Sequence, residues 1–410
     1  MPTIHHGDCI ETMNAMPPES VDAIVTDPPY GLGFMGKKWD SLPPSLEWAE
    51  ACYRVLKPGG HIAAFGGTRT WHRLAVAIED AGFEMRDSLA WLYGSGFPKS
   101  HDVGKAIDKA AGAEREVIGT RIKHGGATPT PGHHGDDGPT RDVWRDSRPS
   151  EAYEIPITAP ATPEAAQWDG WGTALKPAHE PVVLARKPLA EKTVARNVLA
   201  HGTGAINVDA CRIAGDMSGG TWGAKQTTSI GFHGGTEGSG YRTQQSPSGR
   251  WPANVLLDHH AAAWVDEQSG HQKDGVAVNR NKNPDIEKPH TVYGGGWMNG
   301  DRPDITYGGG GGASRFFYSA KAPKSERPNV DGVQHPTVKP LAIMRWLIRL
   351  VTPPGGVVLD PFAGSGATIE AALIEGFDPV GIEMETDYLP LIQHRIDRAT
   401  PHPTHASETA

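Results

Sequence analysis

The sequence predicts an α/β fold built on a mostly parallel, doubly wound sheet and interrupted by loop-rich insertions. Short apolar segments alternate with helical segments at both ends of the chain, which is the order typical of parallel sheets. Between the ends, residues 99–170 and 190–315 show little hydrophobic periodicity. The 410 residues include 51 glycines and 35 prolines, and this composition indicates long loops in those two stretches.

At the amino-terminal end, the pattern predicts three strands and two helices within residues 1–98. The first strand is an apolar run that stops at two prolines, as expected for a buried strand followed by a loop. The first helix stops at the Lys-Pro-Gly-Gly segment 57–60. In chain order the predicted elements are a strand over 21–27, a helix over 46–56, a strand over 61–65, a helix over 69–81 and a strand over 88–93.

The carboxyl-terminal end, residues 316–400, repeats this alternation. An amphipathic pattern predicts a helix over 341–351, and the segments that follow are predicted as a strand, a helix, a strand and a last helix. They cover 356–360, 367–375, 379–383 and 387–398. One further core strand is predicted at 179–188, within the short segment 171–189, and the tail 401–410 is expected to be flexible.

Composition excludes several classes of protein. The net charge of −9 argues against a protein that coats nucleic acid through bulk charge. The first residues show no basic segment followed by an apolar run, and no apolar stretch reaches about 18 residues, so we expect a cytoplasmic protein that does not span a membrane. Cys9, Cys52 and Cys211 are far apart and the 19 histidines have no zinc-ligand spacing, so we expect free thiols and no metal site.

The first motif, Asp27-Pro28-Pro29-Tyr30, directly follows a predicted strand. Asp27 and the carbonyl of Pro28 offer two acceptors for an exocyclic amino group, and the two prolines hold the loop in one shape. Tyr30 offers a flat face on which a base can stack. The motif is suited to position a weakly nucleophilic amino group without a covalent enzyme intermediate.

The second motif lies between a predicted strand and a predicted helix and comprises Asp360, Pro361, Phe362, Ala363, Gly364, Ser365 and Gly366. Its glycines let the backbone approach a ligand closely. Glu383 ends the next predicted strand, where a carboxylate can bind a ribose. Both NAD and S-adenosylmethionine fit this pattern, but the third glycine of the NAD fingerprint is replaced by Ile369, which favours S-adenosylmethionine.

Taken together with three further segments, these motifs resemble the β class of amino-methylating DNA methyltransferases. The first motif continues into GLGFMGKKWD at 31–40, and the further segments are Gly7-Asp8-Cys9, SRFFYSAKA at 314–322 and HPTVKP at 335–340. In that class the catalytic motif comes first, a target-recognition region follows and the cofactor motif comes last. The resemblance covers roughly half of the chain, at its two ends, and it implies a circularly permuted Rossmann-like methyltransferase fold whose sheet has seven strands, one of them antiparallel.

The resemblance also implies functional residues. Asp27, Pro28, Pro29 and Tyr30 would form the catalytic loop. The S-adenosylmethionine pocket would be lined by Asp360, Phe362, Gly364, Ser365 and Gly366, with Glu383 on the ribose and Asp8 on the adenine amino group. Thr337 and Lys339 are candidates for the methionine end of the cofactor, although Asp8 also suits a helix N-cap and Lys339 a surface position. Trp91, Tyr93 and Phe97 are candidates for a second wall around the target base.

The implied reaction is methylation of adenine N6 in duplex DNA, with the base flipped out of the stack. Cytosine N4 is the nearest alternative, and methylation of RNA or of a protein amide is a second. No cysteine follows a proline, so the nucleophile of cytosine-C5 enzymes is absent. Two alternative functions come from other classes: a catalytically silent DNA-binding module and an NAD oxidoreductase.

The distribution of charge fits this interpretation. Residues 1–98 and 328–410 each have a net charge of −5, whereas residues 176–327 carry 18 basic and 14 acidic side chains. We therefore expect one catalytic domain formed by 1–98, 171–189 and 316–400, with an insertion at 99–170 and a target-recognition region at 190–315 that contacts DNA phosphates. Candidate partners besides double-stranded DNA are a second copy of the chain and a restriction endonuclease.

Overall fold

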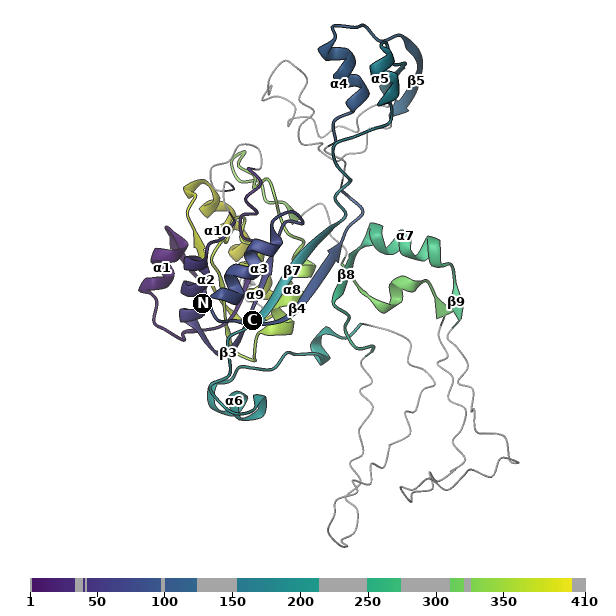
Figure 1. Cartoon of the computed structure of the whole chain (residues 1–410). Coiled ribbons are helices and arrows are strands. Elements are labelled where there is room, and N and C mark those ends of the chain that lie inside the picture. Colours follow the sequence, from purple (N-terminus) through teal and green to yellow (C-terminus); the bar gives the residue numbers. More distant parts are fainter. Residues whose placement is uncertain are drawn as a thin grey trace, which may run out of the picture. The chain divides into compact units, whose positions relative to one another are not determined.

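A nine-stranded sheet forms the centre of the first of two compact units in the computed structural model (Figure 1). The structure describes residues 2–33, 40, 43–96, 100–123, 153–213, 249–273, 310–320 and 326–399. Phe97 and the predicted tail 401–410 lie outside these residues. The first unit comprises Met1–Ser95 and Ala178–Ala410, and the second comprises Gly96–Pro177.

The strands of the large sheet are ordered so that the two ends of the chain interleave. In spatial order they are β1 (Thr3–His6), β13 (Asp378–Glu383), β12 (Val357–Asp360), β2 (Val21–Thr26), β3 (Leu56–Phe65), β7 (His179–Arg186), β4 (Glu84–Leu92), β8 (Val255–Asp258) and β11 (Tyr318–Ala320). All neighbouring pairs are parallel except those of β7, which is antiparallel to both β3 and β4. The predicted α/β class and the single antiparallel strand are confirmed.

The predicted number of seven strands is wrong, because β8 and β11 extend the sheet beyond β4. They have only four and three residues, which is too short for an alternating pattern to stand out in the sequence. β8 forms because Val255, Leu256 and Leu257 pair with Ala90, Trp91 and Leu92 of a strand that is already in place. β1 also lacks a clear pattern, since its sequence is Thr-Ile-His-His.

Alternating side chains of the strands build an apolar core on each face of the sheet. On one face, Ile24 and Leu359 pack with α1 (Cys9–Ala15), α2 (Leu46–Val55) and α3 (Trp71–Asp80). On the other face, Val25 and Val358 pack with α8 (Leu341–Val351) and α9 (Ala367–Ile374). This two-sided burial is why these strands are almost continuously apolar.

The predicted helices at both ends are observed within about two residues of their expected bounds. The last of them, α10 (Leu389–Ala399), follows a short 3₁₀ turn and packs against α9. The strand predicted over 61–65 begins earlier, at Leu56, because the Lys-Pro-Gly-Gly segment is accommodated by a shift of register between Val21 and Ala23. Gly59 has φ +81° there, and the buried Asn197 of α6 (Val194–His201) donates to the carbonyl of Pro58 at 2.8 Å.

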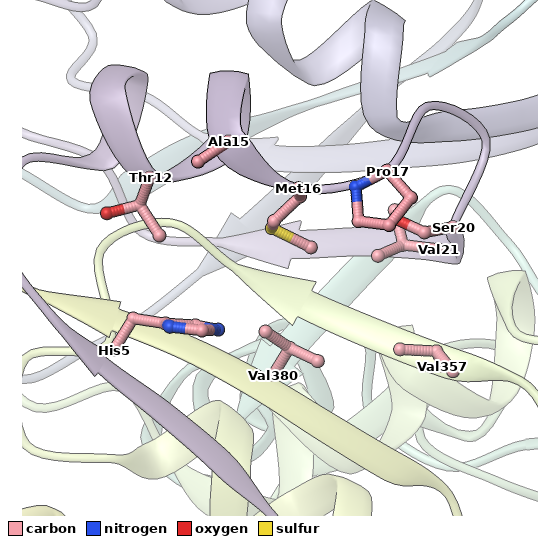
Figure 2. Close-up of a pocket in the computed structure, with 9 residues that line it drawn as sticks. All are labelled: His5, Thr12, Ala15, Met16, Pro17, Ser20, Val21, Val357 and Val380. Atoms are coloured by element: carbon pink, nitrogen blue, oxygen red, sulfur yellow. The ribbon is translucent and has the colours of Figure 1, made fainter.

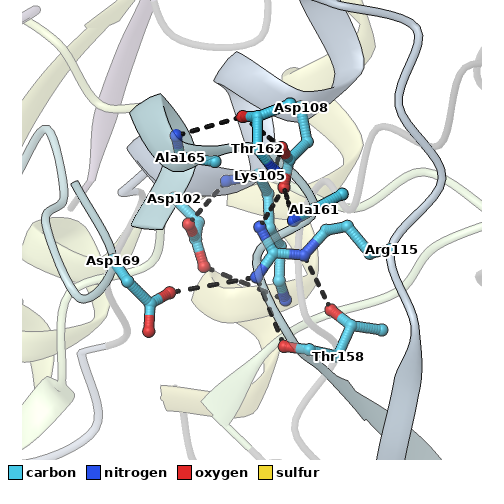
Figure 3. Close-up of polar contacts among 9 residues, drawn as sticks. All are labelled: Asp102, Lys105, Asp108, Arg115, Thr158, Ala161, Thr162, Ala165 and Asp169. Carbon is cyan, nitrogen blue, oxygen red and sulfur yellow. Dashed lines mark hydrogen bonds and ion pairs between the residues drawn. The ribbon is translucent and has the colours of Figure 1, made fainter. Parts of the chain in front are cut away.

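The second unit pairs β5 (Val117–Lys123) with β6 (Tyr153–Thr158) and packs α4 (Val103–Ala110) against α5 (Pro163–Gln167). The Asp108 side chain of α4 connects several segments of this unit through hydrogen bonds (Figure 3). Its carboxylate accepts hydrogen bonds from Arg115 at 2.8 Å, from the backbone of Ala161 at 3.0 Å and from the backbone and hydroxyl of Thr162 at 3.0 and 2.8 Å. Burial alone would raise the pKa of Asp108, but these donors and the Arg115 charge outweigh it and lower the pKa. The unit therefore has its own polar centre.

Candidate active site

The Asp27–Tyr30 loop leaves the carboxyl edge of the sheet where β2 ends, and a buried carboxylate holds it in place. Asp40 accepts hydrogen bonds from the backbone of Tyr30 at 2.7 Å, Gly31 at 2.9 Å and Leu32 at 3.3 Å. The Thr70 hydroxyl donates to the carbonyl of Tyr30 at 2.7 Å. Asp40 ends the segment that extends the first motif, but sequence reasoning gave it no role, because nothing in the sequence indicates that its side chain folds back ten residues.

Asp27, Tyr30, Glu180 and Lys339 form one polar cluster. The ammonium of Lys339 lies 2.8 Å from Asp27 Oδ1, 3.0 Å from Glu180 Oε2 and 2.9 Å from the Tyr30 hydroxyl. That hydroxyl is also 2.9 Å from Asp27 Oδ1 and 3.0 Å from Glu180 Oε2, and its single hydrogen can be donated to one carboxylate at a time. The cluster brings together two predicted site motifs and Glu180, which was not predicted.

The cluster is partly shielded from water, so its charges interact more strongly than they would at an open surface. Only 8% of the Lys339 side chain is exposed. Burial by itself lowers the pKa of Lys339, but Asp27 and Glu180 raise it above its ordinary value, so the ammonium stays charged. For Tyr30, burial raises the pKa of the phenol, and the same two carboxylates raise it further. The phenol therefore stays protonated.

Asp360 connects the Asp27 loop to the glycine-containing loop. It is 2% exposed, and its Oδ1 accepts hydrogen bonds from the Thr26 hydroxyl at 2.7 Å and from the backbone of Phe362 at 3.1 Å. Its Oδ2 accepts from the Thr368 hydroxyl of α9. Burial raises the pKa of Asp360 to about 6, although these hydrogen bonds oppose the shift. Asp360 is thus bonded to the strand, the loop and the helix that surround it.

The glycine-containing loop is bound to Glu383 at the end of β13. Glu383 accepts hydrogen bonds from the backbone of Gly364 at 2.6 Å and of Glu385 at 2.8 Å. Burial raises the pKa of Glu383, with these two hydrogen bonds opposing the shift. Gly364 has φ +52°, and a Cβ on it would lie 3.1 Å from Nε2 of His335. No side chain fits at this point without displacing His335.

The other predicted residues of this motif have packing partners. Gly366 has φ +82°, and a Cβ on it would lie 3.0 Å from the backbone of Ile392 in α10. Ser365 is buried, and the Phe362 ring packs against Trp48 of α2 with centroids 5.9 Å apart. Close packing against α10 is therefore sufficient to explain the glycine at 366.

Asp8 and Thr337 each bond to residues close to them in the chain. Asp8 Oδ1 caps α1 by accepting from the backbone of Ile10 at 2.9 Å and Glu11 at 3.0 Å, which is a typical N-cap arrangement. The preceding residue, Gly7, donates to the carbonyl of Glu383 at 3.0 Å, so Asp8 lies near the end of β13. The backbone of Thr337 contacts the ring of His335.

Two of the three aromatic residues proposed as a second wall lie beside the cluster. The rings of Trp91 and Tyr93 are 5.0 Å apart between centroids. Trp91 is 9% exposed, while Tyr93 is half-buried. Burial raises the pKa of Tyr93 to about 12, with Glu180 adding to the shift. Tyr93 therefore lies within electrostatic reach of Glu180.

An apolar pocket of about 460 Å³ lies between α1 and the sheet (Figure 2). Val21 and Val357, at the starts of β2 and β12, line it together with His5 and Val380. Asp27 follows the other end of β2, which at about 3.3 Å per residue is roughly 20 Å away. This part of the pocket is thus distant from the Asp27 cluster. Within the part of the chain that the structure describes, no group of three or more His, Cys, Asp or Glu could hold a metal ion, and no helix is long and apolar enough to cross a membrane.

Comparison with known proteins gives a family match across most of the chain. The model of a DNA methylase family of N6 and N4 enzymes matches residues 21–394. The type II methyltransferase M.HinfI of Haemophilus influenzae is 29% identical over 110 residues, which are 22% of this chain and 31% of that protein. M.HpaI of Haemophilus parainfluenzae is 36% identical over 102 residues, 23% of this chain and 32% of that protein.

The matched segments thus span about a third of each of these two relatives. Among solved structures, the crystal structure of an M1.HpyAVI–SAM complex aligns with a TM-score of 0.40 and 16% identity. That alignment covers 97% of this chain and 100% of the other.

Proposed function

Because the chain belongs to the N6/N4 DNA methylase family, we propose that it transfers a methyl group from S-adenosylmethionine to the N6 amino group of adenine in double-stranded DNA. The observation that carries the proposal is the junction of the two motifs. Asp360 bonds both to Thr26, the residue before Asp27, and to the backbone of Phe362 in the glycine-containing loop. A group bound at one loop would therefore lie beside a group bound at the other.

The residues around Gly364 fit the cofactor. Gly364 leaves its backbone uncovered, because a Cβ there would lie only 3.1 Å from His335. Glu383 presents a carboxylate at the end of β13, where ribose hydroxyls are bound in Rossmann-like folds. We assign the ribose to Glu383, the adenine amino group to Asp8, and the walls of the pocket to Phe362 and Ser365. When bound, S-adenosylmethionine supplies an electrophilic methyl group on a sulfonium sulfur.

Lys339 was a candidate for the methionine end of the cofactor, together with Thr337. An ammonium has three donors, and three acceptors already surround this one: Asp27, Glu180 and Tyr30. A contact between Lys339 and the methionine carboxylate would have to replace one of these. We therefore propose that the main role of Lys339 is to hold the Asp27 carboxylate.

Asp27 and the Pro28 carbonyl would hold the two hydrogens of the target amino group. Acceptors on both hydrogens favour a pyramidal nitrogen with an available lone pair, which the delocalised amino group otherwise lacks. The target amino group is inside the base stack of duplex DNA, so the base must be flipped out to reach Asp27. Pro29 keeps the loop rigid, and the Tyr30 and Tyr93 rings are candidates to flank the base.

The decisive experiment is incubation of the protein with S-adenosylmethionine and unmethylated genomic DNA, followed by mass spectrometry of the nucleosides. We expect N6-methyladenine, which the Asp27→Ala variant does not form. N4-methylcytosine would overturn only the choice of base, and no methylated nucleoside would overturn the proposal. Sequencing that detects the modification would give the recognition site. A homodimer, a restriction endonuclease partner and a cytoplasmic location remain predictions.

A further inference from the structure

We propose that Glu180 is a positioning residue for methyl transfer and acts on Asp27 through Lys339 and Tyr30. The inference rests on the proposed function and adds a residue that none of the sequence motifs contains. Glu180 contacts both groups that hold Asp27 Oδ1, at 3.0 Å from the Lys339 ammonium and 3.0 Å from the Tyr30 hydroxyl. It therefore controls how strongly those two groups bind Asp27.

The topology of the sheet explains how Glu180 reaches this place. Asp27 follows a strand that ends at the carboxyl edge, whereas Glu180 is the second residue of β7, the antiparallel strand. The start of an antiparallel strand lies at the same edge as the ends of its parallel neighbours. Glu180 is paired in register with Trp91, near the end of β4.

Glu180 also sets the charge of the cluster. Two carboxylates and one ammonium give a net charge of −1, which is partly shielded from water. With a neutral residue in place of Glu180 the net charge becomes zero, and Lys339 pairs with Asp27 alone. Asp27 would then be a weaker acceptor for the amino hydrogens of the target base.

The sign of this charge matters for the reaction. The nitrogen lone pair forms the new N–C bond while the C–S bond breaks and its electron pair stays on sulfur. Positive charge therefore passes from sulfur to nitrogen, and the nitrogen then releases a proton to water. A net negative cluster beside the nitrogen favours the arriving positive charge.

The first test is Glu180→Gln, which keeps the shape of the side chain and removes its charge. We expect kcat for DNA methylation to fall about 10- to 100-fold, with the KM for S-adenosylmethionine changing less than about threefold. Cofactor affinity measured by calorimetry should likewise change little. The matched control is Glu84→Gln, which removes a carboxylate from an ion pair with Arg186 at the other end of the same two strands and should leave kcat near wild type.

The second test is a double-mutant cycle with Lys339→Met. If Glu180 acts in part through Lys339, then Glu180→Gln should lower kcat by a smaller factor in the Lys339→Met background than in the wild type, measured at saturating cofactor. The double variant also removes both charges of the buried pair, so it keeps the comparison possible if Glu180→Gln alone folds poorly. Urea unfolding of each variant checks folding independently of activity.

Three outcomes would overturn the inference: a kcat of Glu180→Gln equal to that of Glu84→Gln, an equal loss of kcat in both backgrounds, or an effect on KM alone. An equal loss would mean that Glu180 acts without Lys339. If the wild-type protein itself methylates no DNA, the proposed function fails, which is a result distinct from any of these. Methylation by the wild type with an unaffected Glu180→Gln variant leaves the proposed function standing.

Discussion

The Thr26 hydroxyl donates a hydrogen bond to Asp360 Oδ1 at 2.7 Å, and this contact joins residues that are 334 positions apart in the chain. Thr26 immediately precedes Asp27, and Asp360 bonds the backbone of Phe362. Both partners are almost fully buried. The contact therefore fixes the end of β2 relative to the end of β12, where the two candidate loops begin.

Replacing Thr26 by valine keeps the shape of the side chain and removes the donor. A buried carboxylate that loses one partner costs about 1–3 kcal/mol of stability. We expect Thr26→Val to lower the free energy of unfolding in urea by that amount and to reduce methyl transfer. The control is Thr120→Val on the exposed side of β5. Equal stability of the two variants would contradict the assigned role of this hydrogen bond.

Asp360 should give the stability a pH dependence that can be measured. Burial raises the pKa of Asp360 from 3.8 to about 6, so the folded protein binds this proton more tightly than the unfolded chain does. The ionised group therefore disfavours folding above about pH 6, and this penalty is lost as the pH falls from about 6 towards 4. Between pH 8 and pH 5, wild type should gain about 1 kcal/mol of stability relative to Asp360→Asn. Parallel stability curves of the two proteins would contradict the raised pKa.

Asp27→Ala should abolish methyl transfer and leave cofactor binding largely intact. The change removes the acceptor for the target amino group, and Lys339 keeps Glu180 as its counter-ion. We expect kcat to fall at least about 10³-fold, with cofactor affinity by calorimetry within about threefold of wild type. Asp397→Ala, an exposed site on α10, is the control. Transfer by Asp27→Ala at a rate near wild type would show that another residue holds the amino group.

Gly364→Val should weaken the binding of S-adenosylmethionine at least about tenfold. Its Cβ would lie 3.1 Å from the His335 ring, and its φ of +52° is unfavourable for a branched side chain. Gly355→Val is the control for the backbone cost alone, because Gly355 has φ +71° but nothing within 4 Å of its Cβ position. Calorimetry with both variants measures the difference. Equal affinities would place the cofactor elsewhere.

The sequence predicts the parts of this fold that have strong local patterns. The strands over 21–26 and 357–360 are almost continuously apolar because helices cover both faces of the sheet. The short strands β8 and β11 carry no such pattern, and their pairing depends on a neighbouring strand already in place. The two loop motifs were found because each stands between a strand and a helix or loop with distinctive residues.

Glu180 shows why part of the site could not be predicted. The strand that contains it was expected, and so was one antiparallel strand, but the sequence does not say which strand runs backwards. Only the pairing of β7 with β3 and β4 brings its first residues to the edge where Asp27 lies. The role of Asp40 was missed for a related reason, since a side chain that binds the backbone of Tyr30 from ten residues away leaves no periodic signal.

A buried ion pair behind the glycine-containing loop gives the last prediction. Arg395 of α10 is 0% exposed and bonds Glu370 of α9, which also binds Arg398 at 2.6 Å. Glu370→Leu would leave the Arg395 charge buried without its carboxylate, so we expect a loss of about 3–5 kcal/mol in urea unfolding. Glu370→Leu combined with Arg395→Met removes both charges and should recover part of this loss. If the double variant instead loses the sum of the two single losses, the two side chains do not stabilise α9 and α10 as a pair.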